Sequence, residues 1–188
     1  MFIQTEQTPN PQTLKFLPGK VVMDEGTAFY QNIDEAQESP FAKRLFSVDG
    51  VEGVFFGSDF ITVKKSESFD WQVLKPSVLG GIIDHFNSGD KTIEKKDTKE
   101  SKNSLNENKD DSEVVKQIKE LLDTRVRPAV AMDGGDIIFN DFEDGIVYLK
   151  MQGACSGCPS STATLKMGIE NMLKHYIPEV QEVRPVDV

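Results

Sequence analysis

The chain of 188 residues contains only two cysteines, Cys155 and Cys158, which stand three positions apart in the run Gly153–Pro159 (GACSGCP). Cysteine thiolates bind zinc and iron–sulfur clusters, and a pair of them can also form a redox-active disulfide. A four-cysteine metal site needs four thiolates, so one chain supplies half of it. The residues alone leave three interpretations open: a metal or cluster site completed by a second copy of the chain, dithiol redox chemistry within one chain, or neither.

The cysteine run is predicted to be a turn between a strand that ends near Met151 and a helix that begins at Pro159. At the start of that helix the amides of residues 160–162 would be unpaired donors, and their partial positive charge would favour thiolate over thiol. Gly153 and Gly157 allow positive φ and let the backbone approach a bulky ligand closely. These properties suit a cysteine that binds a metal or a cluster.

No other residue completes a familiar metal motif. Structural zinc sites usually add a second CxxC or an HxxxH, and the sequence has neither. His175 is interpreted as a cation near the end of the helix that follows the cysteines, and His85 as a surface or capping residue rather than a ligand. A thioredoxin-like protein also places a CxxC before a helix, but only thirty residues follow Cys158, too few for the rest of that fold.

Two further motifs are given structural interpretations. Asp133–Asp136 (DGGD) lacks the later glutamate of a calcium loop and the Lys-Ser/Thr of a phosphate loop, so we expect a turn. Arg125 and Arg127 are interpreted as helix-end cations rather than anion binders, and Pro128 is expected to end their helix.

The composition argues against several classes of protein, including those that bind nucleic acid and those that span a membrane. A net charge of −10 argues against sequence-independent binding to nucleic acid or anionic lipid, because lysine and arginine drive both. No stretch approaches the ~20 apolar residues of a membrane span, and the first residues resemble neither a signal peptide nor an Arg-rich leader. The two cysteines form no framework of disulfides, which favours a reducing cytoplasm. No catalytic constellation is visible in residues 1–89.

The chain is predicted to form two small α+β domains joined by a polar segment. Residues 90–112 hold thirteen charged residues among 23 and no aromatic, glycine or proline. Such a segment cannot bury enough apolar surface to offset its ordering entropy, so we expect a flexible tether, with a solvated charged helix as the alternative. Residues 1–89, with twelve of the sixteen aromatics, and residues 113–188 should each have a core.

The apolar periodicity predicts the elements of both domains. In the first we expect strands at 2–6 and 13–17, a hairpin of 51–56 and 60–64, a helix at 40–46, and a helix capped by Asp70 that Pro76 bends or restarts. In the second we expect a helix from Asp110 or Ser112, a hairpin of 137–140 and 146–151 closed at Asp144-Gly145, a helix ending before Pro178, and an edge strand at 180–186.

Two stretches resemble a known family. Residues 126–172, with the DGGD run and Gly153–Thr162 (GACSGCPSST), resemble the C-terminal domain of NifU and of Nfu-type proteins. Gln7–Pro11 (QTPNP), with Phe55–Gly57 and Phe60–Val63, resembles the domain that precedes it in Nfu proteins of bacteria and mitochondria. The resemblance implies that Cys155 and Cys158 of two protomers hold one [4Fe–4S] cluster, which a holo homodimer passes to apo iron–sulfur proteins.

The resemblance also implies a division of roles. Residues 113–188 would bind the cluster, and residues 1–89, by elimination, would recognise recipients or partners, with an upstream assembly scaffold as a further partner. The first NifU domain, with its own cysteines, is absent, so the chain is of the Nfu type. It begins with Met at about the place where such a domain would begin after leader removal. We therefore expect a bacterial cytoplasmic protein first and a mature mitochondrial form second.

Overall fold

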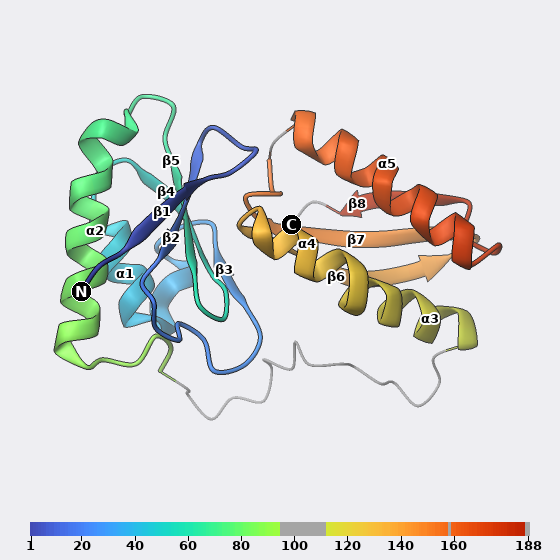
Figure 1. Cartoon of the computed structure of the whole chain (residues 1–188), viewed down its shortest axis with the longest axis horizontal. Coiled ribbons are helices and arrows are strands. Elements are labelled where there is room, and N and C mark those ends of the chain that lie inside the picture. The colour runs from blue at the N-terminus through green and yellow to red at the C-terminus, as the bar shows by residue number, and fades with distance from the viewer. Residues whose placement is uncertain (95–111, 158, 187–188) are drawn as a thin grey trace. The chain divides into compact units, whose positions relative to one another are not determined.

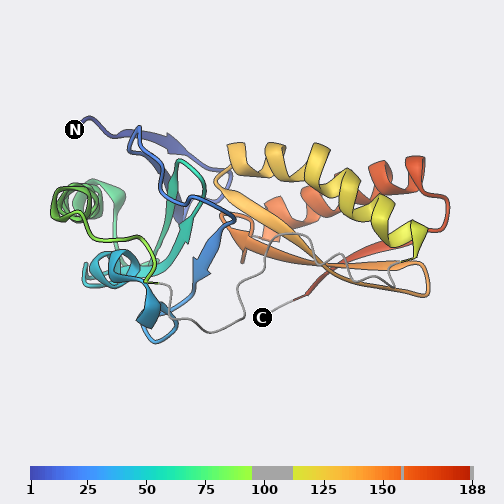
Figure 2. The same ribbon diagram turned by 90° about the horizontal axis from the view of Figure 1, so that it is seen from below.

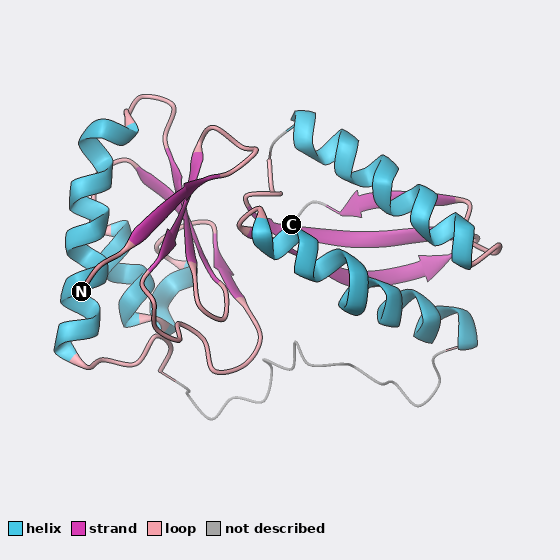
Figure 3. Cartoon of the chain, viewed as in Figure 1, coloured by secondary structure: helices cyan, strands magenta, loops and turns pink. Residues whose placement is uncertain are grey.

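The computed structural model describes residues 1–94, 112–157 and 159–186 (Figure 1). The chain divides into an N-terminal and a C-terminal compact unit. Each unit has its own sheet and its own helices (Figure 3), which confirms the predicted α+β class with two domains. Within the described ranges, no helix combines the length and apolar character needed to cross a membrane.

The N-terminal unit is a five-stranded antiparallel sheet with helices against one face (Figure 2). The strand order is β1-β2-β5-β4-β3. The strands are β1 (Gln4–Gln7), β2 (Thr13–Leu17), β3 (Ala28–Tyr30), β4 (Val51–Phe56) and β5 (Ile61–Lys65); the helices are η1 (Glu35–Glu38), α1 (Pro40–Phe46) and α2 (Trp71–Ser88). The predicted strands and helices are present with small shifts at their ends, whereas β3 and η1 were not predicted.

Side-chain caps start both α-helices of this unit. Ser39 accepts the Ala42 amide at 3.0 Å to start α1, and Asp70 accepts the Gln72 amide at 2.8 Å to start α2, as predicted. Of the predicted bend or restart of the helix at Pro76, the restart is wrong, because α2 runs through this residue without a break. Pro76 removes one backbone donor in the second turn, and the burial of the apolar face of α2 outweighs that loss.

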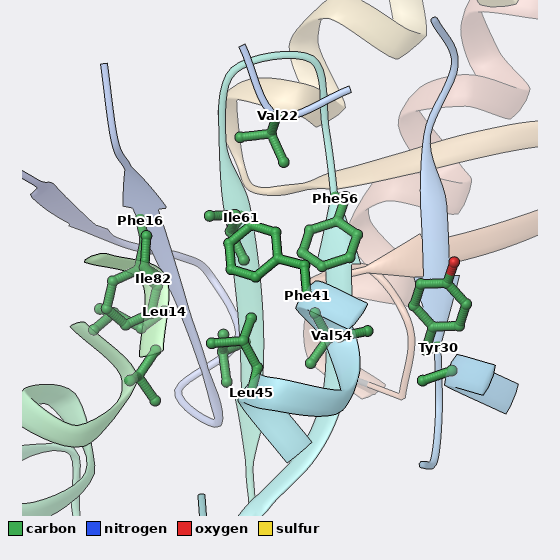
Figure 4. Close-up of a cluster of buried hydrophobic side chains, with 14 of the residues drawn as sticks. Leu14, Phe16, Val22, Tyr30, Phe41, Leu45, Val54, Phe56, Ile61 and Ile82 are labelled. Carbon is green, nitrogen blue, oxygen red and sulfur yellow. The ribbon is translucent and has the colours of Figure 1, made fainter. Parts of the chain in front are cut away.

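The core of the N-terminal unit combines aliphatic side chains with aromatic rings, among which Phe41 is central (Figure 4). Phe41 of α1 stacks on Phe56 of β4, with ring centroids 4.9 Å apart, and on His85 of α2 at 3.8 Å with nearly parallel rings. The expectation that His85 lies at the surface is therefore wrong: it is 2% exposed. His85 follows Ile82 by one helical turn, which places it on the core face of α2.

The first residues of the predicted tether are hydrogen bonded to the N-terminal unit. The Thr92 hydroxyl donates to the Val22 carbonyl at 2.7 Å, the Ser39 hydroxyl donates to the Thr92 carbonyl at 2.5 Å, and the Glu94 amide donates to the Glu38 carbonyl at 2.8 Å. Residues 90–94 are thus anchored. The rest of the predicted tether, residues 95–111, lies outside the described residues.

The C-terminal unit is a three-stranded sheet with helices on one face (Figure 2). Strands β6 (Gly135–Glu143) and β7 (Ile146–Gly153) are antiparallel, and β8 (Glu182–Val186) is parallel to β7 at the edge, as Pro185 predicts. The helices are α3 (Glu113–Leu121), the π-helical turn η2 (Leu122–Val126), α4 (Arg127–Met132) and α5 (Pro159–Tyr176). The predicted hairpin turn is confirmed by positive φ at Asp144 and Gly145.

The first helical segment continues beyond its predicted end. Ser112 caps α3, as expected, by accepting the Val115 amide at 3.4 Å. Pro128 does not end the helix: the chain passes through η2 and starts α4, in whose first turn Pro128 lies. The Arg127 amide donates to the Leu122 carbonyl in the i→i−5 pattern of the π-helical turn, so the chain stays helical up to the proline.

Candidate functional site: the cysteine turn

Cys155 lies in the turn that joins β7 to α5, as the sequence predicts. Strand β7 ends at Gly153 and α5 begins at Pro159. Gly153 and Gly157 have φ of 65° and 74°, which confirms the predicted left-handed conformation. Cys158 lies outside the described residues, so of the two predicted ligands the structure locates only Cys155.

A glycine of the neighbouring strand forms the floor of this turn. A Cβ added to Gly135 would lie 2.7 Å from Cys155 Sγ and 2.7 Å from the Gln152 carbonyl oxygen. The Ala154 amide donates to the Gly134 carbonyl at 3.2 Å, which ties the turn to the same segment. Only glycine fits this approach, so the pair Gly134–Gly135, called the glycine floor below, shapes the position of the sulfur.

The DGGD run is thus only partly the predicted turn. Asp133 and Gly134 follow α4 as a turn, whereas Gly135 and Asp136 already belong to β6. The signal that could have revealed its role was the glycine pair itself, because two adjacent glycines before an apolar strand often mark a close backbone approach.

Arg127 and Asp136 connect α4 to the start of β6. The guanidinium donates from Nε and Nη2 to the two carboxylate oxygens of Asp136, both at 2.9 Å, and from Nη1 to Asp123 at 3.1 Å. The hydrogen bond to Asp136 is the main reason that the pKa of Arg127 is raised above its usual range. Arg127 is therefore an ion-paired connector rather than the predicted helix-end cation. Arg125 lies over the Tyr176 ring, 5.1 Å from its centroid.

The surroundings of Cys155 are mostly apolar. The residue is 6% exposed and belongs to the core cluster of this unit. The Thr162 hydroxyl donates to the Cys155 carbonyl at 3.4 Å, which links the first turns of α5 to the cysteine turn. Apolar burial disfavours a thiolate, whereas a bound metal or donor amides favour it. The thiol at a helix start fits soft-metal or cluster binding better than it fits hard, oxygen-binding cations.

The two histidines do not join the site. His175 lies in the last turn of α5, against the Tyr176 ring at 5.0 Å, as predicted, and His85 lies in the N-terminal unit. In the ranges that the structure describes, no group of three or more His, Cys, Asp or Glu side chains could hold a metal ion. Within the described residues, the site therefore consists of the Cys155 thiol in the turn between β7 and α5.

Fold and turn together define a two-unit α+β protein with a thiol-bearing strand-to-helix turn. The sequence profile of the family described as "Scaffold protein Nfu/NifU N terminal" matches residues 3–89, and that of the NifU-like domain matches residues 118–184. The chain belongs to the Nfu family of iron–sulfur cluster scaffold proteins, as the resemblance predicted.

Named relatives agree with this assignment. NifU-like protein 4, mitochondrial, of Arabidopsis thaliana is 54% identical over 97% of this chain and 65% of that protein. The NFU1 iron-sulfur cluster scaffold homolog, mitochondrial, of Homo sapiens is 52% identical over 99% of this chain and 72% of that protein. A solution structure of a NifU-like protein from Saccharomyces cerevisiae is 28% identical and covers 51% of this chain and 87% of that one, with a TM-score of 0.46. The chain spans about two thirds of the length of the curated relatives it matches.

Proposed function

We propose that two copies of this chain bind one [4Fe–4S] cluster between them, through Cys155 and Cys158 of each, and pass it to apo iron–sulfur proteins. The cysteine turn is the observation that carries this proposal. Each chain has two thiols, and a four-iron cluster takes four thiolates, so the holo form contains at least two chains. The naming of the relatives as iron–sulfur cluster scaffolds supports the same reading.

In this proposal the cluster is cargo rather than a permanent cofactor. The glycine floor lets the backbone approach Cys155 Sγ closely, and the positive φ of Gly153 and Gly157 shapes the turn that presents the sulfur. Donor amides at the start of α5 would neutralise charge on the sulfur atoms. Delivery is then a ligand exchange in which recipient thiolates replace those of the carrier one bond at a time, with no net oxidation or reduction.

The N-terminal unit is assigned to recognition. It has a complete core but no cysteine, so it cannot supply thiolate ligands. We therefore propose that residues 1–89 bind recipients or an upstream assembly scaffold, and that the protein acts as a carrier and not as an enzyme. A chain without residues 1–89 should keep its cluster but deliver it to a cognate apo-enzyme more slowly than the intact chain. Equal transfer rates to several recipients would contradict this role.

The mitochondrial matrix is the proposed location. The relatives from Arabidopsis thaliana and Homo sapiens both carry "mitochondrial" in their names, whereas the expectation of a bacterial cytoplasm finds no support in these two names. Fractionation of source cells, with matrix and cytosolic marker proteins followed in parallel, tests this location directly.

The function is tested by reconstitution with iron and sulfide in the absence of oxygen. We expect about two irons and two sulfides per chain, together with a shift to a dimer or larger species. A colourless dimer that holds zinc and no sulfide would replace the cluster with a bridging zinc ion. A metal-free monomer with a reversible Cys155–Cys158 disulfide and insulin-reducing activity would make the protein a dithiol oxidoreductase. A monomer with a complete four-iron cluster would contradict the shared site.

A further inference from the structure

The ion pair between Arg127 and Asp136 is not part of the proposed ligand set, but its carboxylate is buried and hydrogen bonded three times. The carboxylate receives two parallel hydrogen bonds from the guanidinium at 2.9 Å and a third from the Ile137 amide at 2.8 Å. The Asp136 side chain is only 5% exposed. A planar, two-bond pair of this kind fixes the relative position of the elements it connects, here the starts of α4 and β6.

The start of β6 is also the floor of the cysteine turn. Asp136 directly follows Gly135, whose missing Cβ position lies 2.7 Å from Cys155 Sγ. The preceding residue, Gly134, accepts the Ala154 amide at 3.2 Å. A shift of this strand end relative to α4 therefore moves both contacts that the turn makes with the glycine floor.

The helical segment that carries Arg127 is irregular just before this residue. The π-helical turn Leu122–Val126 immediately precedes Arg127. Such turns are rare and occur frequently at functional sites. Asp123, within this turn, accepts Nη1 of the same guanidinium at 3.1 Å and has a side chain that is 35% exposed. Arg127 thus has one buried partner on β6 and one more exposed partner on its own helical segment.

We propose that Arg127 and Asp136 are positioning residues for the cysteine turn. Their ion pair holds the glycine floor in place, and the floor holds Cys155 in the geometry that takes and keeps the cluster. The pair acts through Gly135 and does not itself contact the cluster. This inference rests on the proposed function. When the pair is loosened, the cluster is lost faster and the buried thiol of the apo protein becomes easier to reach.

The first test compares two carboxylate substitutions around the same guanidinium. Asp136→Asn removes the charge on β6, and Asp123→Asn is the matched control that removes the charge on the helical segment. The reconstituted full-length variants are mixed with an iron chelator without oxygen, at a temperature where unfolding curves show all of them folded, and the visible absorbance is followed. Asp136→Asn should lose its cluster about tenfold faster than the wild type. Asp123→Asn should stay within about twofold of it.

Because removing one member of a buried ion pair can unfold a domain, Arg127→Lys is the second variant. Lysine keeps the positive charge and loses the two-bond geometry. A second measurement needs no cluster: in the Cys158→Ser background, iodoacetamide reports the accessibility of Cys155 alone. Asp136→Asn and Arg127→Lys should both raise the alkylation rate about fivefold or more, while Asp123→Asn leaves it unchanged.

The outcomes separate this inference from the function on which it rests. Unchanged cluster lifetimes and alkylation rates in Asp136→Asn and Arg127→Lys would overturn the positioning role, and so would equal effects of Asp136→Asn and Asp123→Asn. A wild-type protein that takes up no cluster would overturn the proposed function, and the alkylation rates would still decide whether the ion pair positions Cys155.

Discussion

The two units of this chain differ in the residues that pack at critical points of their cores. In the N-terminal unit, Phe41 is stacked on both Phe56 and His85, so an ionisable ring belongs to the aromatic core. The C-terminal core is mainly aliphatic, and at the cysteine turn a glycine instead of a side chain packs against the sulfur. The first arrangement is sensitive to protonation, and the second is sensitive to a single added methyl group. The two units should therefore respond to different perturbations.

The largest effect is expected from the cysteines, which affect the C-terminal unit alone. Cys155→Ala or Cys158→Ala leaves two thiolates per dimer, too few to hold a four-iron cluster, so either change should abolish stable cluster binding. The visible spectrum after reconstitution measures this loss, and far-ultraviolet circular dichroism checks that the fold is kept. Ser156→Ala, in the same turn, is the control that should retain the spectrum. If one cysteine variant keeps the wild-type spectrum, that cysteine is not a ligand.

The second largest effect is a pH dependence confined to the N-terminal unit. Burial lowers the pKa of His85 to about 4, with a further contribution from the Arg44 charge that Asp90 opposes. The unfolded chain binds the proton near the ordinary pKa of 6.5, so stability is complete above that value and falls as the pH drops toward 4. Between about pH 7 and pH 5 the loss should be about 2 kcal/mol.

Trp71, the only tryptophan of the chain, reports unfolding of this unit through its fluorescence in urea. His85→Phe keeps a ring against Phe41 and removes the titrating group, so it should flatten the pH profile. His175→Phe is the control, because the only other histidine lies at the exposed end of α5 and its loss should leave the profile unchanged. A profile that is equally steep in His85→Phe would show that another group is responsible.

The third prediction compares two glycines of the C-terminal unit. Gly135→Ala places a methyl group 2.7 Å from Cys155 Sγ and from a backbone oxygen, so it should cost about 1–3 kcal/mol and weaken cluster retention. Gly168→Ala, in the middle of α5 with nothing within 4 Å, should instead stabilise by about 0.5–1 kcal/mol. Urea unfolding followed by circular dichroism measures both changes. Destabilisation of equal size in the two variants would contradict the role of the glycine floor.

The sequence predicted what depends on neighbours along the chain. Apolar periodicity predicted the positions of α1, α2, α5 and both hairpins. Pro159, together with Gly153 and Gly157, predicted the cysteine turn. Features that depend on contacts between distant segments were not predicted from the sequence. Arg127 and His85 could be assigned to helices, but their partners Asp136 and Phe41 belong to other elements, and no local propensity encodes such pairs. The π-helical turn was not predicted because a proline ends most helices. In this chain the helix continues through Pro128 by way of that turn.

The smallest effect tests where the N-terminal unit ends. Composition predicts a tether from residue 90, whereas the structure anchors Thr92 to the carbonyl of Val22 and the hydroxyl of Ser39. Thr92→Val removes the first of these bonds with little change in shape and should cost about 1 kcal/mol in Trp71-monitored unfolding. Ser39→Ala should cost more, because Ser39 also caps α1 through the Ala42 amide. An unchanged midpoint in Thr92→Val would mean that this hydrogen bond contributes nothing to stability; a measurable loss would show that the folded unit includes Thr92.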